Sequence, residues 1–181
     1  VPNDLTLSRS ALITGSNASG KSTFIKAVAV NAILAQTLHT CCARAYRAPM
    51  AQIVTSMAVQ DSLAAGESYF IAELKSLRRI LEGTRRHFCL CFVDEILKGT
   101  NTVERIAAST AVLSHLARQQ CLCLVASHDI ELTELMAGEY DNYHFREQMQ
   151  SDGIHFDYRL YAGPSATRNA IALLAYLDFD P

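Results

Sequence analysis

The segment at residues 15–22, which reads Gly-Ser-Asn-Ala-Ser-Gly-Lys-Ser, constrains this 181-residue chain more than any other feature. It fits the pattern G-x-x-x-x-G-K-[ST], whose glycines allow a tight loop with backbone N–H groups aimed at a phosphate. A short apolar strand is predicted before it, at residues 11–14, and an apolar stretch after it, at residues 21–38, predicts a buried helix. This order favours ATP binding, with Lys21 on the β- and γ-phosphates and Ser22 on Mg²⁺. An ordinary glycine turn is the alternative.

A second apolar run, at residues 88–93, ends in the carboxylates Asp94 and Glu95. Ligands of open α/β sheets bind at the carboxyl ends of the strands. We therefore expect Asp94 to hold Mg²⁺ and Glu95 to orient or deprotonate the attacking water. His128 follows another predicted strand, and at the same sheet edge it would reach a γ-phosphate or that water. A helix-capping role for the two carboxylates and a structural role for His128 are the alternatives.

Strands that alternate with helices predict an α/β fold with a mainly parallel sheet flanked by helices. Further strands are expected at residues 53–57 and 121–126, and a helix after Gly66 is expected to end near Gly83. Asn101 is a predicted helix cap, with Glu104 at the third position. Alternating residues on both sides of Ser151-Asp152-Gly153 predict a C-terminal antiparallel hairpin, and a last helix is expected at residues 167–177.

The composition fits one domain with a sizeable core, because half of the residues are hydrophobic. Sixteen basic and eighteen acidic residues give a net charge of −2, which argues against this chain as a main DNA-contacting surface. No apolar run has the length of a membrane span, no signal peptide is visible, and the chain begins without methionine. We expect a domain from a longer, cytoplasmic protein that makes no membrane contact through this segment.

Four of the six cysteines form two C-x-C pairs, Cys89 with Cys91 and Cys121 with Cys123, inside apolar runs. Residues two apart in a strand share a face, so each pair is expected to pack in the core as small hydrophobic side chains. A zinc site is the alternative, although the usual spacing is C-x-x-C and no histidine is close in sequence. Free buried thiols are typical of a reducing compartment.

Four segments together, in their order along the chain, resemble the ATPase of the MutS family of DNA mismatch-repair proteins. They read GSNASGKST at residues 15–23, SYFIAE at 68–73, DEILKGTNT at 94–102 and SHDIELTEL at 127–135. The family patterns are GPNMGGKST, S-T-F-x-x-E, D-E-x-x-x-G-T-S-T and a T-H dipeptide. Asn3-Asp4 and the Asp61-Ser62-Leu63 stretch match further family positions, so the resemblance covers nearly the whole chain.

The resemblance implies an ABC-type P-loop ATPase domain over residues 1–181, which uses ATP and Mg²⁺ and works as a homodimer through its ATP sites. Catalysis would fall to Glu95, His128 and Lys21. Ser68 would approach the nucleotide from the other subunit, Asn17 would lie near the terminal phosphate and Asn3 near the base. The implied nucleotide-binding loop consists of Gly15, Ser16, Asn17, Ala18, Ser19, Gly20, Lys21, Ser22 and Thr23.

Several positions depart from the family pattern, which favours a divergent MutS-like branch. Ser16 replaces proline, Ala18 and Ser19 replace Met-Gly, Tyr69 replaces threonine and Asn101 replaces serine. The family has an acidic residue and a glycine where Glu104 and Arg105 stand.

Two functions are compatible with these features. One is a DNA-processing ATPase whose DNA-binding parts lie outside this chain. The other is a nucleotide switch that scaffolds or signals without DNA. A small-molecule kinase would share only the glycine loop.

Overall fold

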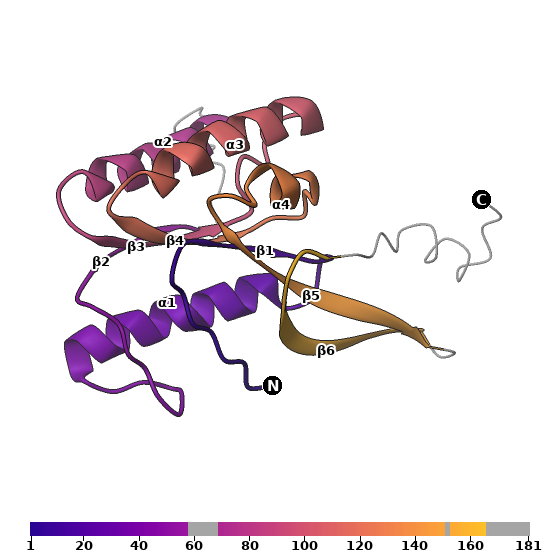
Figure 1. Cartoon of the computed structure of the whole chain (residues 1–181), viewed down its shortest axis with the longest axis horizontal. Coiled ribbons are helices and arrows are strands. Elements are labelled where there is room, and N and C mark those ends of the chain that lie inside the picture. Colours follow the sequence, from indigo (N-terminus) through magenta and orange to yellow (C-terminus); the bar gives the residue numbers. More distant parts are fainter. Residues whose placement is uncertain (58–68, 151–152, 166–181) are drawn as a thin grey trace.

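The structure is a computed structural model that describes residues 1–57, 69–150 and 153–165. These residues form a six-stranded sheet with helices on both faces (Figure 1). The elements in chain order are β1 (Ala11–Thr14), α1 (Lys21–Leu38), β2 (Gln52–Ser56), α2 (Tyr69–Thr84), β3 (Cys89–Asp94), α3 (Thr102–Ala117), β4 (Cys121–Ala126), α4 (Glu131–Leu135), β5 (Asp141–Gln150) and β6 (Gly153–Ala162).

The strand order is β2-β3-β4-β1-β5-β6, and the first five strands run parallel. β5 and β6 pair antiparallel, with a register shift between Phe145 and Glu147. The predicted mixed α/β fold with a C-terminal hairpin is thus confirmed. Ala126 of β4 is the register partner of both Ile13 and Asp94, so β1, β3 and β4 end at one edge of the sheet.

Each face of the sheet carries its own apolar core. On one face α1 packs over a cluster that includes Ile25, Ala29 and Phe92. The other cluster lies beneath α2, α3 and α4, which cover the opposite face together (Figure 1). Strong burial of the strands on both sides accounts for their continuous apolar runs.

The four C-x-C cysteines lie in the core beneath α2 and α3, at 0–9% exposure, so the packing prediction is confirmed. The parallel register places Cys89 opposite Cys121 and Cys91 opposite Cys123. The sulfur atoms of Cys91, Cys121 and Cys123 lie within 4.8 Å of one another, and within the described ranges the group has these three members. Their surroundings are apolar side chains, so they serve the core as small hydrophobic residues.

The prediction that the helix at residues 21–38 is buried is wrong for one of its faces. α1 turns Ile25, Ala29 and Ala32 toward the sheet, but Val30, Ile33 and Leu38 are 50%, 45% and 67% exposed. A helix that packs on a sheet buries mainly the stripe that faces the sheet, however apolar the rest of its surface is.

Smaller differences concern helix and strand ends. α2 continues through Gly83 to Thr84, and β2 begins one residue before the predicted strand. The Asn101 cap is confirmed, because its side chain accepts a hydrogen bond from the Glu104 N–H at 3.0 Å. The helix expected at residues 167–177 and the segment at 61–66 lie outside the described residues. Among the described helices, none combines the length and hydrophobicity of a membrane span.

Candidate active site

The loop between β1 and α1 needs glycine at its two ends. Gly15 has a φ of +144°, and a Cβ there would lie 2.7 Å from the Phe145 carbonyl oxygen. Gly20 has a φ of +106°, and its Cβ would lie 3.2 Å from the ring of Tyr158. Both conformations favour glycine on backbone grounds as well. The loop therefore packs closely against the β5–β6 hairpin, which the chain pattern alone did not indicate.

Lys21 is enclosed by this loop. Its Nζ donates hydrogen bonds of 2.7 Å to the carbonyl oxygens of Gly15 and Ser16, and the residue is 4% exposed. Burial lowers the pKa of the Lys21 ammonium, and the nearby carboxylates of Glu95, Asp94 and Glu147 offset this only in part. The N-terminus of α1 adds the partial positive charge of the helix dipole to the loop. The first turn of α1 holds no acidic residue, and its N-cap makes no side-chain hydrogen bond. The loop thus has the properties of an anion site.

Ser22 and Asp94 meet at the carboxyl edge of the sheet. The Ser22 hydroxyl donates a 2.8 Å hydrogen bond to the Asp94 carboxylate, which comes from the end of β3. A hydroxyl and a carboxylate side by side are the oxygen ligands that Mg²⁺ prefers. The donor set at this position therefore fits a magnesium ion.

Glu95 follows Asp94 in a strained turn, with a φ of +58°. Its backbone N–H donates to the Ala126 carbonyl at 3.1 Å, and its carboxylate pairs with Lys98 at 2.7 Å. Partial burial acts to raise the pKa of Glu95, but the hydrogen bond and charge of Lys98, with His128 and Lys21, outweigh it and lower that pKa. The side chain is therefore a carboxylate at neutral pH.

The loop after Glu95 is fastened to α2 by a buried carboxylate. Glu73 is 3% exposed and accepts hydrogen bonds of 3.0 Å from the backbone N–H groups of both Lys98 and Gly99. Glu73 belongs to the SYFIAE segment, but the sequence alone predicts no role for it. It lies in the second turn of a helix, where charged residues are common, so only the fold reveals its hydrogen-bond partners.

His128 lies on the other side of Glu95, with 4.0 Å between its Nδ1 and the Glu95 Oε1. Its side chain is 42% exposed. The residues beside it are fixed: the Ser127 N–H donates to the Ile13 carbonyl at 3.0 Å, and Asp129 forms a buried ion pair with Arg105. The predicted position of His128 at the sheet edge is thus confirmed.

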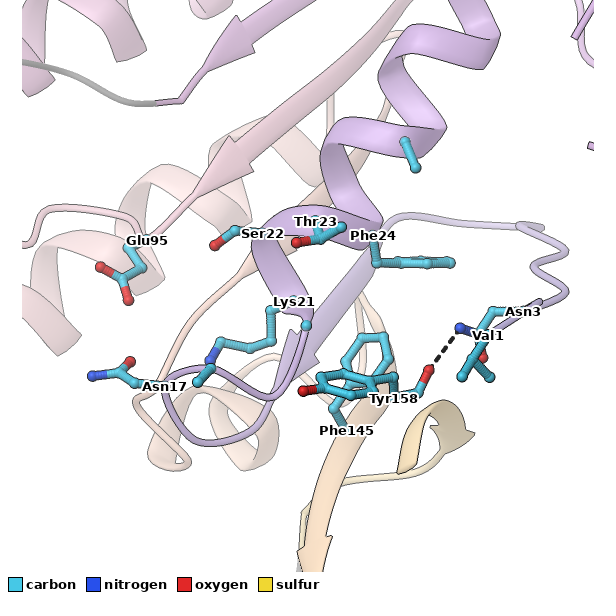
Figure 2. A pocket seen from close by; sticks show the side chains of 13 residues that line it. Val1, Asn3, Asn17, Lys21, Ser22, Thr23, Phe24, Glu95, Phe145 and Tyr158 are labelled. Carbon is cyan, nitrogen blue, oxygen red and sulfur yellow. Dashed lines mark hydrogen bonds between the residues drawn. The ribbon is translucent and has the colours of Figure 1, made fainter. Parts of the chain in front are cut away.

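A pocket of about 540 Å³ extends from this carboxyl edge to the β5–β6 hairpin. Figure 2 shows its two ends: Asn17, Lys21 and Glu95 at one, and the rings of Phe24, Phe145 and Tyr158 at the other. The full lining consists of Val1, Asn3, Asn17, Ala18, Gly20, Lys21, Ser22, Thr23, Phe24, Ala27, Glu95, Phe145 and Tyr158. A charged end and an aromatic end in one pocket suit a ligand with a phosphate chain and a flat ring.

The aromatic end is held in place by Asn3. The Asn3 amide donates to the Tyr158 carbonyl at 2.9 Å (Figure 2). It also accepts from the Leu160 N–H at 2.8 Å, so both of its polar groups bind β6. Tyr158 has a φ of +54°, a left-handed conformation that is rare for this residue type. Tyr158 could not be predicted as a site residue from the sequence, because nothing in an alternating strand marks the position where the chain turns a ring toward the loop.

Most of the predicted site residues are therefore neighbours. The loop residues Asn17 to Thr23, except Ser19, share the pocket lining with Glu95 and Asn3, while Asp94 contacts Ser22. Ser19 is buried, and its hydroxyl has no hydrogen-bond partner among the described residues. The Ser16 hydroxyl donates to the Glu147 carboxylate. Ser68 lies outside the described residues.

Comparison with known proteins identifies the family of this chain. The model of MutS domain V matches residues 11–177 of the chain. A DNA mismatch repair protein MutS of Thermus thermophilus is 34% identical over 169 residues, which cover 92% of this chain and 21% of that protein. The protein of the same name from Thermus aquaticus is 32% identical over 97% of this chain and 22% of its own length. That from Sorangium cellulosum is 36% identical over 96% of this chain and 20% of its own length.

The fold and the site define an α/β domain with a charged pocket at the carboxyl edge of its parallel strands. This chain belongs to the MutS family, in the region of domain V. It spans about a fifth of the length of the relatives that it matches.

Proposed function

We propose that this chain is a P-loop ATPase domain of the ABC type, which binds ATP with Mg²⁺ and hydrolyses it. The observation that carries the proposal is the 2.8 Å contact between Ser22 and Asp94, two residues from separate motifs that meet beside Lys21 and Glu95. An acidic helix cap or an ordinary glycine turn would not require that meeting. The domain would occupy residues 1–181 of a longer protein.

Lys21 and the first turn of α1 would bind the phosphates. An ammonium has three N–H donors, and within the described chain two of those of Lys21 bind the loop carbonyls at 2.7 Å. The third is left for a phosphate oxygen. The loop is thus already folded around its lysine, so little ordering is needed when ATP binds.

Ser22 and Asp94 would hold the magnesium ion, which supplies positive charge to the phosphates when bound. Their hydroxyl and carboxylate oxygens are in direct contact with each other. Asp94 comes from the end of a buried strand and Ser22 from the first turn of α1, so both are held by rigid elements.

Glu95 would orient the attacking water and accept its proton, because its side chain is an ionised carboxylate at neutral pH. His128, 4.0 Å from the Glu95 carboxylate, would contact the same water or the terminal phosphate. Lys98 pairs with the other Glu95 oxygen at 2.7 Å, which leaves Oε1 on the side of His128 for the water.

Tyr158 and Phe24 would enclose the base. Both rings line the end of the pocket away from Glu95, and the Phe24 ring packs edge-on against Phe145 at 5.8 Å between centroids. Asn3 would act on the base indirectly, because its amide is used to hold the Tyr158 backbone. Stacking on aromatic rings is worth about 1–3 kcal/mol per base.

We further propose that the domain works as a homodimer in a MutS-like protein that processes DNA. The resemblance implies that Ser68 would approach the nucleotide of the other subunit, and the named relatives are DNA mismatch repair proteins. The net charge of −2 argues against this chain as the main DNA-contacting surface, so the DNA contacts would come from regions outside it. The departures at Ser16, Ala18 and Arg105 favour a divergent branch of the family.

Nucleotide binding by a Lys21→Ala variant tests the proposal. We expect wild type to bind ATP in the presence of Mg²⁺ and Lys21→Ala to lose measurable binding, because the ammonium that faces the phosphates is gone. Lys26→Ala is the matched control, since Lys26 is an exposed lysine of the same helix. Equal ATP affinity in wild type and Lys21→Ala would refute the proposed site.

A further inference from the structure

A buried ion pair links the two loops that carry Glu95 and His128. The Arg105 guanidinium donates to both oxygens of Asp129, from Nε at 2.8 Å and from Nη2 at 2.7 Å. The two side chains are 11% and 4% exposed. A bidentate pair of this kind fixes both distance and orientation, because two parallel hydrogen bonds leave no free rotation.

Each partner of this pair is attached to one of the loops. Arg105 lies in the first turn of α3, directly after the loop that follows Glu95, and its Nη1 donates to the Thr100 carbonyl at 3.4 Å. Asp129 is the residue after His128, and its backbone N–H donates to the Ser127 hydroxyl at 3.0 Å. Arg105 therefore contacts the Glu95 loop and the His128 segment at the same time.

We infer that Arg105 and Asp129 are positioning residues that set the distance between His128 and Glu95. The His128 side chain is 42% exposed, and its ring nitrogens lie 4.0 Å from the Glu95 carboxylate and 3.8 Å from the Asp129 carboxylate. The position of such an exposed ring depends on the position of its own backbone. The neighbouring residues Ser127 and Asp129 fix the backbone of His128. The inference rests on the proposed ATP hydrolysis at this site.

Burial of the Arg105–Asp129 pair carries a cost in stability, and a positioning role would explain why the pair is present. Burying two charges carries a desolvation penalty that an apolar pair of the same size avoids, so a buried ion pair adds little net stability. The apolar cluster on this side of the sheet includes leucines and cysteines beneath α3. Arg105 and Asp129 lie at its end toward the site, where a fixed geometry is useful.

The role in turnover is tested by measuring ATP hydrolysis and ATP binding by two variants, Arg105→Gln and Asp129→Asn. We expect kcat to fall about 10- to 100-fold, the cost of a misplaced reacting group, while ATP affinity stays within about twofold because neither residue lines the pocket. In a His128→Ala background, Arg105→Gln should have no further effect on kcat. The control is Arg9→Gln, which removes an arginine that pairs with Asp141 at 2.6 Å, before β1.

A second measurement is independent of turnover. In spectra of the protein with ¹³C-labelled histidine, the His128 ring signal, assigned with His128→Gln, should shift or broaden in Arg105→Gln and Asp129→Asn but not in Arg9→Gln. The other five histidines serve as internal references for folding. Unchanged His128 signals in both pair variants, or an equal loss of kcat with and without His128, would overturn the inference. Absence of hydrolysis by wild type would instead overturn the proposed function, and the ring signal would still decide the positioning role.

Discussion

Ser22 donates a hydrogen bond of 2.8 Å to Asp94, although 72 positions separate them in the chain. One residue lies in the first turn of α1 and the other ends β3, so the contact exists only because both elements meet at the carboxyl edge of the sheet. The proposed metal site depends on this contact.

Ser22→Ala and Asp94→Asn should weaken ATP binding in Mg²⁺ by about 10-fold or more, since a hydrogen bond to a charged group is worth about 1.5–3 kcal/mol. Binding in EDTA should stay near the wild-type value, because Lys21 and the loop are intact. Calorimetric titrations with and without Mg²⁺ measure both affinities. Thr37→Ala, at the far end of α1, is the control. Equal losses in Mg²⁺ and in EDTA would contradict a metal role.

Glu95→Gln should bind ATP as wild type does and hydrolyse it about 10²- to 10⁴-fold more slowly. The amide keeps the size of the side chain but has no carboxylate to accept a proton from water. Phosphate release under single-turnover conditions gives the rate, and Glu82→Gln, an exposed glutamate of α2, is the control. A rate within about threefold of wild type would exclude Glu95 as the base, since a positioned base contributes far more than that.

Tyr158→Ala should weaken ATP affinity by about 5- to 150-fold, the value of one stacking contact, and should affect inorganic triphosphate much less. Tyr161→Ala is the matched control, because Tyr161 lies on the same strand but stacks on His144 and under Arg146, away from the pocket. Fluorescence titration with the two ligands separates the base from the phosphate contribution. An equal loss for ATP and triphosphate would place the base elsewhere.

Mixing Ser68→Ala with Lys21→Ala subunits tests the proposed composite site. If Ser68 acts on nucleotide held by the partner's loop, a mixed dimer has one site with both defects and one with neither, so hydrolysis should recover in part. If both residues serve the same site within one subunit, every site keeps one defect and nothing is recovered. Tagged subunits purified as mixed dimers are needed, and no recovery in that preparation would rule out the trans arrangement.

Local patterns predicted the parts of the site that depend on strand ends. Lys21, Asp94, Glu95 and His128 each follow a buried apolar run, and the ends of parallel strands meet at one edge, so their proximity follows from chain order. The Asn101 cap was equally predictable, because it depends on the Glu104 N–H only three residues away.

Contacts that depend on the packing of distant elements could not be predicted from the sequence. Arg105 and Asp129 are 24 residues apart and read as ordinary charged positions, since a charge pattern does not reveal which charges are buried. Tyr158 reaches the loop only because of the irregular pairing of β5 and β6. The exposed apolar residues of α1 were misjudged because hydrophobic composition does not say how much surface the rest of the fold covers.

The Arg105–Asp129 pair also has an evolutionary consequence. Loss of either charge leaves the other buried and unpaired, at a cost of about 3–5 kcal/mol, which is a large part of the stability of a typical domain. Positions 105 and 129 are therefore expected to change together. Relatives with the family's glycine at the first position should carry an uncharged residue at the second, and lineages with a single charge should be short-lived.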